Sequence, residues 1–191
     1  MEIRSFLAFE LPEGIKKTVT RISGELRHSD LDARWVKPEN IHLTVVFMGN
    51  INSDDLGRLT AEVEDVCSGY GIFDIALKGM GCFPNRHRPR VLWMGLDGNL
   101  DRMSRFRDDL QESLKAFGIK GERRGFKPHL TLARFRSMRK TGSELEDILK
   151  VYEALESTFE SVSELFLFKS ELKPGGAVYT KLKSWPLSGG K

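Results

Sequence analysis

The sequence predicts a mixed α+β fold in which the same order of strands and helices occurs twice. Three observations predict it: four stretches with helical apolar spacing, short strand-like runs between them, and an element order that repeats after 87 residues. A chain of 191 residues allows one compact domain or two small lobes that share a core. We therefore interpret residues 1–191 as one bilobal domain with pseudo-repeats of about 1–90 and 91–184.

Apolar residues three and four positions apart form one stripe in each of four segments. Such stripes pack against a core, so they predict helices and carry no information about chemistry. The four stripes span Ile15 to Leu26, Leu56 to Val66, Leu100 to Phe117 and Leu145 to Leu155.

Short runs of β-branched, aromatic and other apolar residues lie between the predicted helices and indicate strands. These runs cover residues 3–9, 41–48, 72–77, 91–96, 130–135, 162–168 and 178–182. Strands and helices are interspersed, which is typical of α/β and α+β chains. The last four residues, 188–191, are expected to form a loose tail.

The repeat centres on two short motifs. Ile-His-Leu-Thr-Val at 41–45 resembles Pro-His-Leu-Thr-Leu at 128–132, and the two histidines lie 87 residues apart. The same offset carries residues 6–9 onto 93–96 and the first predicted helix onto the third. A duplicated fold of this kind predicts a pseudo-twofold axis, which would bring the two motifs face to face.

Each motif places a histidine and a threonine on the same face of a strand, about 7 Å apart. The pairs are His42 with Thr44 and His129 with Thr131. Because imidazole has a pKa near 6.5, one histidine can donate a proton while the other accepts one. Threonine hydroxyls can donate hydrogen bonds to phosphate oxygens, so the four residues suit in-line attack of water at phosphorus. The alternative for each histidine is an ordinary core position on a strand.

Other reaction classes find little support in the sequence. No cluster of histidine, cysteine or acidic residues accompanies either motif, so we expect no metal site. Cys67 falls on a helix stripe and Cys82 lies before a turn, and no Gly-x-Ser-x-Gly segment occurs. A phosphate-binding glycine loop is also missing, so neither ATP nor any other cofactor is expected.

Composition points to a soluble protein in a reducing compartment. Hydrophobic residues make up 40% and charged residues 30% of the chain, and no apolar run reaches the roughly 18 residues of a membrane span. Two cysteines are too few for a disulfide framework. The chain begins with a strand-like segment and no signal peptide is apparent, so we expect a cytoplasmic protein.

Positive charge is concentrated although the net charge is only +3. Between residues 119 and 140 eight basic residues stand against Glu122 alone. Such clustering favours an anionic partner, the alternative being a solvated surface loop. The basic residues are Lys120, Arg123, Arg124, Lys127, Arg134, Arg136, Arg139 and Lys140, with Arg86, Arg88 and Arg90 in a second segment.

Four segments resemble the hallmarks of a known family: Arg-Ser-Phe-Leu-Ala-Phe at 4–9, Trp35 to Gly49, Pro89 to Gly95 and Phe126 to Arg134. With its two His-x-Thr motifs the chain resembles the 2H phosphoesterase superfamily. Within it, the chain is similar to the bacterial and archaeal RNA 2′,3′-cyclic phosphodiesterases, historically called 2′-5′ RNA ligases. The resemblance extends over essentially the whole chain.

This resemblance implies a bilobal α+β fold, with antiparallel sheets lining a central cleft and helices on the outside. It implies hydrolysis of RNA 3′-terminal 2′,3′-cyclic phosphates to 2′-phosphates without a metal. His42 would donate a proton to the departing O3′ and His129 would accept one from water, an assignment that the symmetric motifs alone do not give. The residues implied to bind the phosphate are Thr44, Thr131, Arg134 and Lys127.

The expected partner is RNA with a 2′,3′-cyclic phosphate end, tRNA fragments above all, and we expect a monomer. Basic segments would contact upstream phosphates, which predicts salt-sensitive binding. Aromatic residues near the motifs are candidates for stacking a terminal base, although each could instead pack in the core. These candidates are Phe9, Trp35, Phe47 and Phe126.

Three alternatives stay open at this point. The same chemistry run backward, with a ribose 5′-OH replacing water, would join tRNA halves through a 2′-5′ linkage. Small cyclic phosphates, such as ADP-ribose cyclic phosphate, would also suit the predicted site. A non-catalytic RNA-binding protein could share the fold, although intact His and Thr at all four motif positions argue against it.

Overall fold

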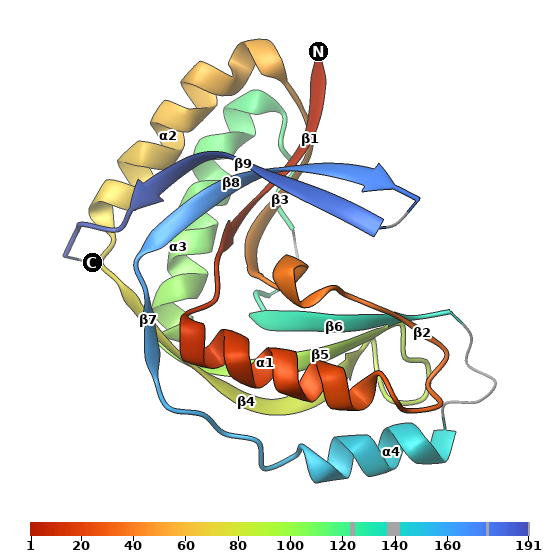
Figure 1. Cartoon of the computed structure of the whole chain (residues 1–191). Coiled ribbons are helices and arrows are strands. Elements are labelled where there is room, and N and C mark those ends of the chain that lie inside the picture. The colour runs from red at the N-terminus through yellow and green to blue at the C-terminus, as the bar shows by residue number, and fades with distance from the viewer. Residues whose placement is uncertain (123–124, 137–141, 175, 191) are drawn as a thin grey trace.

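A computed structural model describes residues 1–122, 125–136, 142–174 and 176–190 (Figure 1). Within these ranges it contains two antiparallel sheets and four α-helices, which confirms the predicted α+β fold. No helix in the described ranges is long and apolar enough to cross a membrane. The helices are α1 (Glu13–Leu26), α2 (Leu56–Gly69), α3 (Leu100–Ser113) and α4 (Gly142–Val151), with 3-10 turns η1 (Pro38–Asn40), η2 (Ser53–Asp55) and η3 (Leu114–Phe117).

The first sheet, sheet A, has the strand order β3-β1-β8-β9, and the second, sheet B, has the order β2-β6-β5-β4-β7. Every pair of neighbouring strands is antiparallel. The strands are β1 (Glu2–Phe9), β2 (Ala33–Trp35), β3 (Leu43–Asn52), β4 (Phe73–Phe83), β5 (Val91–Gly98), β6 (His129–Phe135), β7 (Glu160–Val162), β8 (Glu164–Lys173) and β9 (Gly176–Pro186).

Each half of the chain supplies a strand to the sheet of the other half. In sheet A, β1 and β3 come from the first half, and β8 from the second half pairs with β1. In sheet B, β5 and β6 come from the second half, and β4 from the first half pairs with β5. The backbone hydrogen bonds of each sheet therefore join both halves of the sequence.

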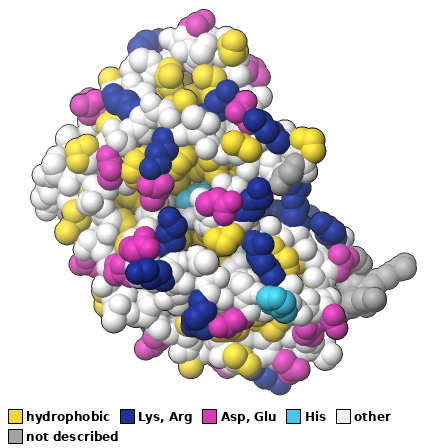
Figure 2. Space-filling view, in the orientation of Figure 1, with side chains coloured by type: hydrophobic (Ala, Val, Ile, Leu, Met, Phe, Trp, Pro, Cys, Tyr) yellow, Lys and Arg dark blue, Asp and Glu magenta, His cyan; other side chains and the backbone are white. Residues whose placement is uncertain are grey.

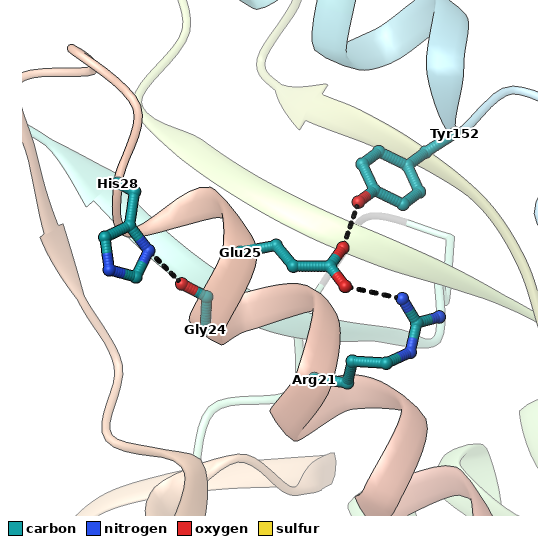
Figure 3. Close-up of polar contacts among 5 residues, drawn as sticks. All are labelled: Arg21, Gly24, Glu25, His28 and Tyr152. Carbon is teal, nitrogen blue, oxygen red and sulfur yellow. Dashed lines mark hydrogen bonds and ion pairs between the residues drawn. The ribbon is translucent and has the colours of Figure 1, made fainter.

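Helices α2 and α3 lie on the side of sheet A, and α1 and α4 lie on the side of sheet B (Figure 1). Helices α1 and α4 are joined by side chains (Figure 3). The Tyr152 hydroxyl donates a hydrogen bond of 3.0 Å to the Glu25 carboxylate, which also forms a 2.7 Å ion pair with Arg21. Arg21 and, to a smaller extent, Tyr152 lower the pKa of Glu25. This exposed contact joins α1 to the residue that directly follows α4.

The C-terminal segment is part of the packed structure. Trp185 and Leu187 are buried in the core that the two sheets share, and the Gly189 N–H donates a hydrogen bond of 3.0 Å to the Tyr70 carbonyl. The expectation of a loose tail is therefore wrong for Gly189, because this residue packs against the end of α2. Lys191 lies outside the described residues.

Candidate active site

A β-bulge follows the first His-x-Thr motif. Thr44 pairs with Ala8 of β1, but Leu7, the residue before Ala8, pairs with Val46. Val45 is therefore an extra residue in β3. Val45 and Val46 are both buried, so the alternation of faces shifts by one position. Phe47 is consequently exposed on the same face as Thr44, where it lines a pocket.

The second motif is followed by the same irregularity. In β6 the register shifts after Thr131, and Leu132 and Ala133 are both fully buried. Arg134 is exposed and thereby shares the face of His129 and Thr131. Without the bulge, a residue five positions after His129 would point to the opposite face of the strand. The bulge thus brings the predicted phosphate ligand Arg134 to the motif.

The His42 ring is held by a backbone group and by aromatic rings. Its Nδ1 lies 2.8 Å from the Asn40 carbonyl oxygen. The ring stacks on Phe6 at 4.6 Å between centroids and 22° between planes, and Tyr179 meets it edge-on at 5.3 Å. Burial among these rings disfavours the charged imidazolium and lowers the pKa of His42 to about 4, although the bond to Asn40 opposes the shift.

His129 is held in a similar way in different surroundings. Its Nδ1 lies 2.7 Å from the Lys127 carbonyl oxygen. Phe83 meets the ring edge-on at 4.9 Å, and the Trp93 ring lies 6.4 Å away. Burial lowers the pKa of His129, the Lys127 carbonyl opposes this shift, and the positive charge of Arg134 reinforces it. Lys127 therefore acts on His129 through its backbone, while its side chain is exposed at the pocket.

Both rings have the same tautomer when they are neutral. A carbonyl oxygen can only accept a hydrogen bond, so Nδ1 of each neutral ring must carry the proton. Nε2 of His42 and of His129 is then left with a lone pair that can accept a proton. The ring that acts as an acid must gain a proton, which a bound anion would favour.

A pocket of about 1170 Å³ connects the two sheets, because Thr44 of β3 and His129 of β6 both line it. Strands β3 and β6 also contact each other directly. Figure 2 shows a histidine side chain in a hollow between hydrophobic side chains, with lysine and arginine side chains nearby. The charged residues lining the pocket are Arg88, Arg90, Arg107, Lys120, Lys127 and Glu122. Arg123, Arg124, Arg139 and Lys140, which belong to the predicted basic segment, lie outside the described residues.

Two of the four predicted stacking residues line the pocket, and Phe47 is the more exposed of them. Phe47 is 65% exposed, and Phe126 lines the pocket beneath the Arg107 guanidinium. Phe9 was a wrong prediction, because it is fully buried and its ring packs in the core against that of Phe106. Trp35 is partly buried and also packs against the core.

Sequence reasoning missed several residues that hold the histidines. Asn40 supplies a backbone carbonyl, and Phe6, Trp93 and Tyr179 supply rings. Phe6 and Trp93 correspond to each other at the offset of 87 residues, which is a signal that could have identified them. Tyr179 lies in no motif.

No group of three or more histidine, cysteine or acidic residues in the described part of the chain could hold a metal ion. Cys67 and Cys82 are buried and not joined by a disulfide. Burial raises the pKa of the Cys67 thiol to about 12 and that of Cys82 to about 11, so neither is a reactive thiolate at neutral pH. Independence from metals stays a prediction.

A family model for LigT-like phosphoesterases matches residues 9–93 and 96–179. The chain belongs to the LigT-like phosphoesterase family. The two matched segments of this LigT-like phosphoesterase begin 87 residues apart, which is also the distance between its two histidine motifs.

Relatives of similar length are known. A protein of Methanothermobacter thermautotrophicus named RNA 2′,3′-cyclic phosphodiesterase is 34% identical over 187 residues, which cover 98% of this LigT-like phosphoesterase and 100% of that protein. A protein of Aquifex aeolicus with the same name is 29% identical over 189 residues, covering 98% of each chain.

Solved structures share the fold. The Thermus thermophilus protein TT0787 matches with a TM-score of 0.80 and 27% identity, covering 98% of this chain and 99% of that one. E. coli LigT, solved in complex with 3′-AMP, matches over the same shares of the two chains with a TM-score of 0.78. At 24% identity this second likeness concerns the fold alone.

Proposed function

We propose that this LigT-like phosphoesterase is an RNA 2′,3′-cyclic phosphodiesterase, with His42 and His129 as its acid–base pair. The observation that carries the proposal is the matched geometry of the two motifs. Each ring is held at Nδ1 by the carbonyl two residues upstream, which leaves Nε2 for proton transfer. Relatives named RNA 2′,3′-cyclic phosphodiesterase support the assignment of the substrate.

In the proposed reaction, His129 accepts a proton from water, and the water oxygen forms a bond to phosphorus. The P–O3′ bond breaks in line with this attack, and His42 gives its proton to O3′. The products are a 2′-phosphomonoester and a free 3′-hydroxyl. This direction follows the family resemblance, because burial lowers the pKa of both rings and the shifts do not distinguish an acid from a base.

The phosphate is held by Thr44, Thr131 and Arg134 in this proposal. Both threonines follow a histidine at the second position and are partly exposed, so their hydroxyls are available to equatorial oxygens. Arg134 shares their face of β6 because of the bulge. A cation near the non-bridging oxygens stabilises the charge that develops on them during attack.

The RNA chain leading to the cyclic end occupies the basic pocket. Five basic residues against one acidic residue line it, and the exposed Phe47 offers a ring face for a base. Lys127 contributes as one of the five pocket cations. We further propose tRNA fragments with cyclic ends as substrates and a monomeric, cytoplasmic enzyme. Higher salt should then weaken binding of an oligonucleotide more than that of a mononucleotide.

A second candidate activity is 2′-5′ RNA ligation. The pocket of about 1170 Å³ adjoins His129, the proposed base, and this space could admit the 5′-OH end of a second RNA in place of water. Adding an RNA with a 5′-hydroxyl to the hydrolysis assay, and resolving the products by length, distinguishes the two reactions. A longer product with a 2′-5′ linkage would favour ligation.

The test of hydrolysis uses EDTA-treated protein and a short RNA that ends in a 2′,3′-cyclic phosphate. Wild type should yield the terminal 2′-phosphate, whereas His42→Ala and His129→Ala should not. His28→Ala is the matched control, since His28 lies just after α1 and its side chain hydrogen-bonds only to the Gly24 carbonyl among the described residues (Figure 3). Absence of turnover by wild type, or equal turnover by all variants, would overturn the proposal.

A further inference from the structure

Tyrosine hydroxyls in this protein have different partners. The Tyr70 hydroxyl donates to the Asp109 carboxylate at 2.7 Å, and the Tyr152 hydroxyl donates to Glu25 at 3.0 Å (Figure 3). The hydroxyl of Tyr179, the third and last tyrosine, has no hydrogen-bond partner within the part of the chain that the structure describes. Tyr179 is half-buried, so its ring is fixed while its O–H group lacks an acceptor.

The ring of Tyr179 belongs to the surroundings of His42. It meets the His42 ring at 84° and the Phe6 ring at 76°, with 5.3 Å and 5.0 Å between centroids. The Asn40 side-chain amide donates a hydrogen bond of 2.8 Å to the Ala177 carbonyl, two residues before Tyr179 in β9. Asn40 therefore connects β9 to the carbonyl that holds His42, and Tyr179 is positioned against the proposed acid.

The charges that act on Tyr179 are positive. Burial raises the pKa of the Tyr179 hydroxyl, and the positive charges of Arg134 of sheet B and Arg4 of β1 oppose this rise. Arg4 lies two residues before Phe6 and so on the same face of β1. The Tyr179 hydroxyl, on which both cations act, is a hydrogen-bond donor that still needs an acceptor. An anionic oxygen would accept the hydrogen bond of the hydroxyl and would be attracted by the charges of Arg134 and Arg4.

We propose that Tyr179 is a substrate-binding residue whose hydroxyl donates a hydrogen bond to a non-bridging oxygen of the cyclic phosphate, on the side of His42. The positive charges of Arg134 and Arg4, which already act on the Tyr179 hydroxyl, would attract this oxygen. The identity of the anion rests on the proposed function, whereas the anion site itself rests on the contacts of Tyr179. The phosphate would thus be held from both sheets, by Tyr179 in sheet A and by Arg134 in sheet B.

The variant Tyr179→Phe removes the hydroxyl and keeps the ring against His42. It should raise the dissociation constant for inorganic phosphate, measured by calorimetric titration, about tenfold, and lower kcat/KM for a cyclic phosphate about tenfold. Its Tm should equal that of wild type, because the hydroxyl has no partner in the described part of the protein. Tyr152→Phe is the control: it should lower the Tm and leave phosphate affinity and kcat/KM unchanged.

Wild-type phosphate affinity and kcat/KM in Tyr179→Phe would overturn the inference. A loss of Tm as large as that of Tyr152→Phe would also overturn it, because the hydroxyl would then have a structural partner. If wild type does not hydrolyse the cyclic phosphate, the phosphate titration still tests whether the anion site exists. Weaker binding by Tyr179→Phe would support the anion site although the proposed function had failed, and equal binding would refute it.

Discussion

Two histidines with the same backbone contact lie in different aromatic surroundings. His42 stacks flat on Phe6, whereas His129 meets Phe83 edge-on and has Arg134 nearby. In both cases burial is the largest influence on the imidazole pKa, and it favours the neutral ring. Substrate anions would counter this effect, so the protonated state needed for acid catalysis should form mainly in the complex.

The pH dependence of the reaction follows from these shifts. Both imidazoles have pKa values below 6.5, that of His42 at about 4. The active form, with one ring protonated and one neutral, is most populated between the two pKa values, so kcat/KM should peak below pH 6.5. Bound phosphate raises both pKa values, and kcat should therefore peak at higher pH.

Initial-rate profiles of kcat/KM and of kcat between about pH 4 and 9 check this prediction. Coincident optima for the two parameters, or a kcat/KM optimum above about pH 7, would contradict it.

The paired motifs could be predicted from the sequence because period-two alternation places each histidine and threonine on one face. Tyr179 could not be predicted. It lies 137 residues after His42, and it reaches that ring only because β8 crosses to the sheet of the first half and β9 follows it. Arg134 was predicted by resemblance, and the bulge in β6 is the physical reason for its position.

At the scale of elements, helices were the most predictable because their apolar stripes are long. β2 was missed, since its three residues Ala33–Trp35 are too short to show a period. β4 runs to Phe83, beyond the predicted end at Leu77, because Gly79 and Gly81 interrupt the apolar pattern without ending the strand. The register shifts could not be predicted either, because a bulge depends on the partner strand.

Gly81 gives a prediction about β4 and β5. A Cβ atom at this position would overlap the Trp93 ring, which packs between Gly81, Phe83 and His129. Gly81→Ala should therefore cost about 1–3 kcal/mol of unfolding free energy. It should also lower kcat/KM, because the displaced indole would move the groups that hold His129.

The control is Gly57→Ala on the exposed side of α2, where an added Cβ meets nothing within 4 Å. It should stabilise the protein by less than about 1 kcal/mol and leave kcat/KM unchanged. Denaturant titration and steady-state kinetics measure both effects. Gly81→Ala with wild-type stability and activity would show that Trp93 does not constrain the site.

At the scale of the whole molecule, the exchange of β4 and β8 between the halves ties the two sheets together. We propose that the chain is one domain made of two pseudo-repeats, about 1–90 and 91–184. The two segments that match the LigT-like family model support this proposal, because their starts differ by the offset of the histidine motifs. Apolar periodicity did not indicate that β4 would join sheet B or that β8 would join sheet A.

Such a molecule should unfold as one unit. Trp185 reports on sheet A and Trp93 on sheet B, so a variant that keeps only Trp185 of the three tryptophans can be compared with one that keeps only Trp93. Their fluorescence transitions in denaturant should have the same midpoint. Separate midpoints in stability-matched variants would indicate two independently folding lobes and contradict the single-domain proposal.

The central claim is that His42 and His129 act in one step. The most direct measurement is the single-turnover rate of wild type, His42→Ala, His129→Ala and the double variant on an RNA ending in a 2′,3′-cyclic phosphate. Each single variant should be slower by about 10²–10⁴-fold, and the double variant should be hardly slower than the slower single one. A single variant that keeps the wild-type rate, or losses that multiply in the double variant, would contradict the account.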